Sequence, residues 1–423
     1  MDTTIVHLLT QLFPRDAVLD WARSTGAVRR LRDIHPADLV CALVSGAMGD
    51  EERSIATIRR MFDRIAGFMP EESSFYTRFN EGLALLMRLL WLRALSRANR
   101  TQRKRLARVL GVKVKDLRVV DATQASLPSW ARDEFPSTHK VLGGFKLTAT
   151  MSLLDELLVS AHLTDARRHD RKAFELPEDI QGVLYLFDRG YCDHQLFHQI
   201  AKSGGFFLGR LKSSSVPRLT RVRSGLGKAH IGERLDSFLP YRGIVDVDAE
   251  FNIGGGRTAT FRMVSVPVRQ RISGRTRTTY VDLVTNLSPT RFSAAAIGEM
   301  YRLRFAVETL FKILKTVGRL DQLRSGNRPV IEAFAFAALL GMTLAHSVCA
   351  AMREKRPDIE PSPHRVALLT LAYLPRFLAV LGTKALAGVV EQFINALWRE
   401  GRNPNPGRRY ATSRHIISVE KSR

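Results

Sequence analysis

Cysteine is scarce in this 423-residue chain, which contains only Cys41, Cys192 and Cys349. The count is odd, the positions are far apart, and no Cys-x-x-Cys pair occurs, so neither a disulfide framework nor a structural zinc site is favoured. We therefore expect a reducing, cytoplasmic environment. The first residues show no basic segment followed by a long apolar run, and we expect no secretion signal there.

Acidic residues are few relative to basic ones. Asp plus Glu total 41 against 65 Lys plus Arg, which gives a formal net charge of +24 and a sequence pI of about 10.6. Such an excess attracts polyanions, either nucleic acid or an anionic membrane surface. A protein that is simply basic is the alternative, and charge alone does not choose between them. Hydrophobic residues make up 45% of the chain, which excludes wholesale disorder.

Several common functional motifs are missing. The chain has no Gly-x-x-x-x-Gly-Lys phosphate loop, no Gly-x-Ser-x-Gly nucleophile elbow and no histidine cluster. One long apolar run exists, at residues 333–352, and its length suits a membrane span. It is rich in alanine and contains Gly341 and His346, so we interpret it as a buried core helix and expect no membrane association.

The N-terminal segment, residues 1–115, repeats apolar residues at three- and four-residue spacing, which predicts helices. Positions 93–118 hold ten cations and a single acid, Asp116. Solvated helical faces usually interleave both signs, so we interpret this run as a phosphate-facing surface. The candidate DNA contacts within it are Arg103, Lys104 and Arg105.

The rest of the chain alternates between β-rich and helical segments. Residues 116–211 predict a strand containing Asp121, a two-stranded hairpin, a buried strand ending at Asp188, a helix and another strand. Residues 212–290 alternate apolar and polar positions between basic loops, which predicts an inserted antiparallel β module. Helices return at 291–330 and 331–400, and a basic tail at 401–423 is expected to be flexible. The fold class is therefore mixed α/β.

Two acidic residues stand where buried strands are predicted to end. Asp121 follows the apolar run LRVV, and Asp188 follows VLYLF. A strand end holds a side chain rigidly at the edge of a sheet, where it reaches solvent. A single such Asp more often caps a helix or makes a turn. Two of them in one predicted sheet favour a functional site.

A predicted helix from residue 301 carries the third acid. At about 100° per residue, Tyr301, Arg304, Glu308 and Lys315 fall within an arc of about 60°, with Lys312 close by and apolar residues opposite. One carboxylate among several cations suits a metal-bound phosphate. Carboxylates from two strands and a helix suit Mg²⁺, which prefers oxygen ligands. Two such ions about 3.5–4 Å apart can stabilise a phosphoryl displacement.

These motifs resemble a known family. The spacing Tyr301-x2-Arg304-x3-Glu308-x6-Lys315 is similar to the Tyr–Arg–Glu–Lys signature of bacterial DDE transposases of the insertion-sequence-four (IS-four) family. VVDAT and LYLFDRGYCD resemble that family's first and second Asp blocks, and FFLGRLK and LVTNL are similar to further family patterns. The resemblance covers about residues 115–330. It implies an RNase H-like catalytic core, interrupted by the β module and flanked by helical N- and C-terminal regions.

The resemblance also implies roles for individual residues. Asp121, Asp188 and Glu308 would form the catalytic triad and bind two Mg²⁺ ions, with Mn²⁺ able to substitute. The residues expected to contact transposon-end DNA near the cleaved phosphate are Tyr301, Arg304 and Lys315, with Lys312 beside them and Arg189 from the second Asp block.

The chain departs from the family at one point. Some members stabilise a flipped base with a Trp in the β insertion, whereas residues 212–290 contain no Trp. The aromatic residues available to replace it are equally candidates for the core, so the use of a DNA hairpin stays open. They are Tyr241, Phe251, Phe261 and Tyr280.

Four hypotheses follow from the sequence. The first is a cut-and-paste transposase, a homodimer in a synaptic complex on double-stranded DNA, cleaving at inverted-repeat ends and joining them to target DNA at the bacterial nucleoid. The second is an RNase H-like, structure-selective nuclease without strand transfer. The third is a non-catalytic, transposase-derived repressor, which the intact triad disfavours. A membrane-surface protein is the most remote.

Overall fold

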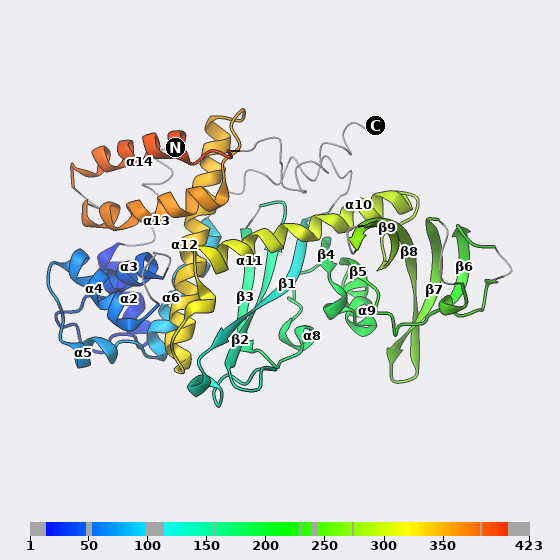
Figure 1. Ribbon diagram of the computed structural model, residues 1–423, viewed down its shortest axis with the longest axis horizontal. Helices are drawn as coiled ribbons and strands as arrows, with labels where there is room; N and C mark the ends of the chain where they lie inside the picture. The colour runs from blue at the N-terminus through cyan, green and yellow to red at the C-terminus, as the bar shows by residue number, and fades with distance from the viewer. Residues whose placement is uncertain are drawn as a thin grey trace.

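The computed structural model describes residues 14–47, 53–97, 114–155, 157–227, 230–238, 243–272, 275–380 and 383–404. Helices from both ends of the chain pack together on one side of the molecule, and a long sheet extends away from them (Figure 1). The predicted mixed α/β class is confirmed. The cationic run at 98–113, including Arg103, Lys104 and Arg105, lies outside the described residues, as do Tyr241 and most of the tail.

The N-terminal helices pack against a long C-terminal helix. Ser54 caps α4 by accepting a hydrogen bond from the Thr57 backbone N–H, and Gly67, at φ 78°, ends that helix. Ring contacts join α6 to α12, where the Trp91 and Phe336 centroids lie 5.7 Å apart. The described helices here are α2 (Arg15–Ser24), α3 (Pro36–Gly46), α4 (Ile55–Ala66), α5 (Glu72–Tyr76), α6 (Glu81–Arg97), α12 (Arg328–Lys355), α13 (Pro363–Val380) and α14 (Leu386–Glu400).

Helix α12 contains the long apolar run. Within the described residues it is the one helix long and apolar enough to cross a membrane, and 89% of its most apolar 18-residue window is buried inside the protein. It packs mainly against α6, α13 and α3. The run therefore packs as a core helix, in agreement with the sequence interpretation.

The sheet has nine strands in the order β3-β2-β1-β4-β5-β9-β8-β7-β6. Only the β1–β4 and β4–β5 pairs are parallel, and the other neighbours are antiparallel. The strands of the predicted β module thus continue the same sheet through the β5–β9 pair. The strands are β1 (Asp116–Leu127), β2 (Gly143–Ser152), β3 (Leu157–Asp165), β4 (Val183–Phe187), β5 (Phe206–Arg210), β6 (Arg218–Ser224), β7 (Val245–Gly254), β8 (Arg257–Ile272) and β9 (Arg275–Thr285).

The central strands are buried on both faces, both the parallel strand β4 and the antiparallel strand β2. All five residues of β4 and all ten of β2 are buried. The helices that cover or connect the strands are α8 (Asp170–Ala173), α9 (His194–Lys202), α10 (Ala294–Arg302) and α11 (Ala306–Thr316). Helix α10 approaches β8 closely at Gly298, because a Cβ there would lie 3.1 Å from a methyl carbon of Val266.

The expected continuous helix from residue 301 is wrong. Helix α10 ends at Arg302, the 3₁₀ turn η5 spans Leu303–Phe305, and α11 begins at Ala306. The uniform 100° rotation therefore does not hold across this turn. Arg304 is buried within it, at 7% relative exposure, instead of sharing a solvent-facing stripe with Glu308.

Candidate active site

Adjacent parallel strands bring the two aspartates to neighbouring positions. Val120 of β1 pairs with Phe187 of β4. Asp121 and Asp188 are the residues that directly follow this pair. The expectation that Asp121 ends its strand is wrong, because β1 continues to Leu127 by pairing with β2. What ends beside Asp121 is the parallel pairing with β4, and this opens the sheet edge at the two carboxylates.

Arg304 joins the carboxylates of this site. Its Nη1 donates to Asp121 Oδ2 at 3.1 Å, and its Nη2 donates to Glu308 Oε1 at 3.3 Å. The hydroxyl of Tyr301 donates to Asp188 Oδ1 at 3.3 Å. The turn η5 and the two helices around it therefore bring together the acids and two of the predicted DNA contacts.

Burial and charge act on these groups together. Burial, to which the nearby carboxylates of Asp188 and Glu308 add, raises the pKa of Asp121 to about 6, although the Ala122 backbone N–H and Arg304 oppose the shift. Burial, followed by the charge of Asp188, also raises the pKa of Tyr301, so its hydroxyl stays protonated and donates a hydrogen bond. The site favours cations.

The carboxylates of the site are the type of ligand that a hard metal ion prefers. Asp121, Asp188 and Glu308 supply only oxygen ligands, which is the preference of Mg²⁺. Burial is the main cause of the raised pKa of Asp121, and repulsion from Asp188 and Glu308 adds a smaller part that positive charge would relieve. Among the described residues, however, no group of three or more Asp, Glu, His or Cys side chains is arranged to hold a metal. The guanidinium of Arg304 occupies the space between Asp121 and Glu308.

The remaining predicted cations surround this centre to different degrees. Arg189 is exposed in the turn after Asp188, Lys312 is exposed on α11, and Lys315 is half-buried on the same helix. Of the aromatic residues considered for base stacking, Phe251 and Phe261 are 1% and 6% exposed and belong to the core.

Two residues that sequence reasoning missed support the turn at Arg189. The ammonium of Lys146 on β2, whose side chain is 4% exposed, donates to Asp170 Oδ1 at 2.6 Å. Asp170 in turn packs under Gly190, where an added Cβ would lie 2.8 Å from its Oδ2. A larger residue at position 190 would have to displace the Asp170 carboxylate from this place. Asp170 lies in a polar segment that carries no sequence signal for this role.

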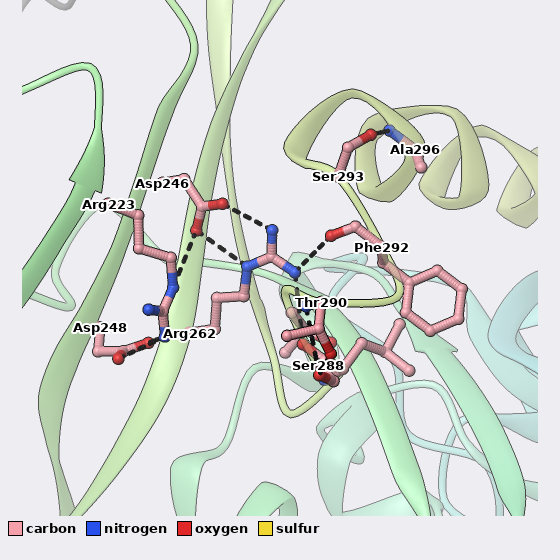
Figure 2. A network of polar contacts seen from close by, with 11 residues as sticks. Arg223, Asp246, Asp248, Arg262, Ser288, Thr290, Phe292, Ser293 and Ala296 are labelled. Carbon is pink, nitrogen blue, oxygen red and sulfur yellow. Dashed lines mark hydrogen bonds and ion pairs between the residues drawn. The ribbon is translucent and has the colours of Figure 1, made fainter.

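A buried ion pair fixes the start of α10 (Figure 2). Arg262 on β8 donates from Nε to Asp246 Oδ1 at 2.9 Å and from Nη2 to Asp246 Oδ2 at 2.6 Å. Its Nη1 donates to the Phe292 carbonyl at 2.8 Å and to the Leu287 carbonyl at 3.4 Å.

The same network reaches the helix cap and a second arginine. Phe292 precedes Ser293, whose hydroxyl caps α10 by accepting from the Ala296 backbone N–H. Arg223 on β6 binds Asp248, and its Nε lies 3.7 Å from Asp246 Oδ1. Strands β6, β7 and β8 thereby hold the segment that leads to Tyr301 and Arg304. The sequence offered no sign of this, since Arg262 resembles any other cation of a basic strand.

Comparison with known proteins agrees with this arrangement. Residues 113–344, more than half of the chain, match the family described as "Transposase DDE domain". The chain is 24% identical over 231 residues to y4zB of Sinorhizobium fredii, which is named as a transposase; the match covers 54% of this chain and 59% of that protein.

Two Escherichia coli proteins are similar to shorter parts of the chain. They are InsL of insertion sequence element IS186A and the transposase of insertion sequence element IS421, each 36% identical over 69 residues, 16% of this chain and 19% of the relative. The chain thus spans less than two thirds of each of these relatives. The family match nevertheless covers both aspartates, Arg304 and Glu308, and the chain belongs to the DDE transposase domain family.

Proposed function

We propose that this protein is a cut-and-paste DNA transposase of the IS-four type. The observation that carries the proposal is that Arg304 binds Asp121 and Glu308 while the neighbouring Tyr301 binds Asp188, in a chain of the DDE transposase family. The substrates would be double-stranded inverted-repeat ends and target DNA. The working form would be a homodimer in a synaptic complex in the bacterial cytoplasm.

The proposed domains follow the predicted boundaries. Residues 1–115 would bind DNA, and residues 116–211 and 291–330 would form the RNase H-like core around the inserted strands of 212–290. Helices of 331–400 would support the core, and the basic tail, 401–423, would add non-specific DNA affinity. A mixed sheet with the acids on adjacent parallel strands supports this division.

The triad would hold Mg²⁺, with Mn²⁺ able to substitute. Two bound ions would activate the attacking water or 3′-hydroxyl and stabilise the leaving oxygen. Tyr301 orients the carboxylate of Asp188 through its hydroxyl. Arg304 neutralises Asp121 and Glu308 in the absence of other cations and would contact phosphate when DNA is bound. The remaining phosphate contacts would come from Lys312, Lys315 and Arg189.

A cleavage and joining assay tests the proposal. A DNA carrying a matched inverted-repeat end and a supercoiled target are incubated with protein and Mg²⁺. We expect cut ends and joined products, both absent for Asp188→Asn and Glu308→Gln. Matched controls are Asp179→Asn, an exposed acid, and Glu299→Gln on α10. These two variants should retain activity.

The outcomes separate the competing functions. Cut ends without joined products, even from pre-cleaved ends, would indicate a nuclease. DNA binding with no metal-dependent cleavage would indicate a repressor. Wild-type activity in either Asp188→Asn or Glu308→Gln would overturn the assignment of the triad.

A further inference from the structure

Lys146 is a buried lysine beside the candidate active site. Its strand, β2, pairs with β1, and Lys146 lies opposite Gln124, beyond Asp121 toward the catalytic edge. The side chain is 4% exposed, and its ammonium donates to Asp170 Oδ1 and to the Arg168 carbonyl, both at 2.6 Å. A buried charge is costly unless it is paired and hydrogen-bonded. The lysine therefore holds the Asp170 carboxylate firmly in one place.

The Lys146 side chain lies on the opposite face of the sheet from the Asp121 side chain. Asp121 pairs with Ala149, and Gln124 pairs with Lys146. Side chains alternate along a strand, and positions 121 and 124 are an odd number of residues apart, so the two pairs face opposite sides. Ala149 belongs to the core that contains the apolar residues of α11, whereas Tyr191 belongs to the core on the other face. Any effect of Lys146 on the reaction must therefore pass through the residues that it holds.

The direction of Asp188 depends on the turn that follows it. Among the described strand pairs, those of β4 with β1 and β5 end at Phe187, so Asp188 lies just outside the sheet. The 3₁₀ turn η2 (Arg189–Tyr191) begins directly after it, and the Tyr191 backbone N–H donates to the Asp188 carbonyl at 3.0 Å. A displacement of η2 would therefore turn the Asp188 carboxylate, which also accepts the Tyr301 hydroxyl.

Helix α8 supports η2 at two points. An added Cβ on Gly190 would lie 2.8 Å from Asp170 Oδ2, so this carboxylate packs directly against the backbone of the turn. Arg171, the next residue of α8, donates from Nε to Asp193 Oδ2 at 2.7 Å, and Asp193 caps α9. Helix α8 thus contacts the chain on both sides of Tyr191, whose side chain is fully buried.

Tyr191 lies close to both the ion pair and the acids. Burial raises the pKa of its hydroxyl, and the negative charges of Asp170, Asp121 and Asp188 add to the shift. The phenol therefore stays protonated, within electrostatic range of all three carboxylates. Its ring packs against Phe187, with the ring centroids 6.1 Å apart. Movement of η2 would thus press this ring against the residue that precedes Asp188.

We propose that Lys146 and Asp170 are positioning residues for the reaction: their ion pair fixes η2 and thereby directs the carboxylate of Asp188 and the guanidinium of Arg189. The inference rests on the proposed function and adds to it two residues that act through the turn. Ligands in such sites must keep their positions to within about 0.5 Å. Removing a group that orients a metal ligand typically lowers metal affinity or activity by about 10–100-fold.

Three variants disturb the ion pair in different ways. Asp170→Asn keeps the shape under Gly190 but leaves the charge of Lys146 buried without its partner. Lys146→Met/Asp170→Asn removes both charges. Gly190→Ala keeps both charges and displaces the Asp170 carboxylate with its added Cβ. The matched control is Lys115→Met/Asp179→Asn, which removes an exposed Lys–Asp pair near the opposite end of β1.

Two measurements follow each variant. Electron paramagnetic resonance of free Mn²⁺ gives the affinity of the ion for the protein–DNA complex, and a cleavage assay gives turnover and the KM for DNA. We expect Mn²⁺ affinity and turnover to fall by about tenfold or more in all three variants, and to stay unchanged in the control. The salt slope of DNA binding should change by no more than one phosphate contact, about 0.9, because only Arg189 would be misplaced.

Melting temperatures separate positioning from stability. Asp170→Asn should lower the melting temperature because it leaves a buried cation unpaired, and Lys146→Met/Asp170→Asn should recover most of that loss. The double variant should nevertheless keep the weak Mn²⁺ binding and the low turnover. If both recover together with the melting temperature, the pair is only structural and the proposal is overturned. Wild-type Mn²⁺ affinity and turnover in Gly190→Ala would overturn it as well.

The wild-type protein is the reference for these outcomes. If it binds Mn²⁺ and cleaves DNA while the three variants match it, the positioning role fails and the proposed function stands. If it neither binds Mn²⁺ nor cleaves, the proposed function itself fails. Should Asp170→Asn not fold, the double variant and Gly190→Ala decide the question by the same two measurements.

Discussion

Replacing Arg262 with methionine should destabilise the protein strongly. Its side chain is 3% exposed and donates two hydrogen bonds to Asp246 and two to backbone carbonyls. Removing one partner of a buried ion pair typically costs about 3–5 kcal/mol, because the other charge stays buried and unpaired. Arg223, with its Nε 3.7 Å from Asp246, offers partial compensation. We therefore expect the free energy of unfolding to fall by about 3 kcal/mol.

Urea unfolding of matched variants measures this loss. Arg234→Met is the control, since its pair with Asp236 is exposed, with side chains 56% and 49% accessible, and should contribute below about 1 kcal/mol. The double variant Arg262→Met/Asp246→Leu should recover most of the loss, because an apolar pair leaves no buried charge. If Arg262→Met lowered the free energy of unfolding by less than about 1 kcal/mol, the reasoning would be refuted. It would also be refuted if the loss in the double variant equalled the sum of the losses in the two single variants.

The same variant should also report on the site. Arg262 holds the carbonyl of Phe292, directly before the cap of α10, and this helix leads to Tyr301 and Arg304. Loosening that segment should lower the turnover of DNA cleavage more than the affinity for DNA. Arg262→Lys should restore part of the turnover. An equal effect on both quantities would indicate a general loss of fold instead.

Three further predictions concern the site and the helical region. Burial raises the pKa of Asp121 to about 6, whereas the same carboxyl in the unfolded chain titrates near about pH 4. The folded protein therefore keeps this proton between about pH 4 and 6, and it loses stability as the pH rises through that range. Asp121→Asn should therefore raise the melting temperature at pH 7.5, without metal, and not at pH 4; an equal rise at both would contradict this. Gly82→Ala should lower the free energy of unfolding in urea by about 1–3 kcal/mol, because the added Cβ would lie 2.3 Å from the Ala27 nitrogen. Gly388→Ala is the control and should be neutral or stabilising, since its added Cβ meets nothing within 4 Å. Glu308→Gln should change stability by less than about 1 kcal/mol, since the side chain is 55% exposed, while abolishing cleavage; a large loss of stability would indicate a structural role.

Local sequence patterns were sufficient to locate the acids. The apolar run VLYLF predicted a buried strand before Asp188, and β4 is buried at all five positions. The run at 333–352 was interpreted as a core helix, and most of it is buried. These features depend on side chains a few residues apart, which the chain alone determines through hydrophobic burial and strand geometry. The sequence also singled out Tyr301, Arg304 and Glu308, although the single helical stripe predicted to carry them is interrupted by the turn at Leu303–Phe305.

Only the tertiary structure decided how those residues meet. The turn at Leu303–Phe305 interrupts the expected helix and buries Arg304 against Asp121, 183 residues earlier in the chain. Pairing with β2 extends β1 beyond Asp121. Arg262 on β8 binds Asp246 on β7 and the carbonyl of Phe292, just before α10. Ion pairs of this kind join groups brought close by the sheet, and their strength depends on burial that no local pattern records. The sequence therefore determined which residues carry charge, and the packing of the sheet and helices decided which charges face each other.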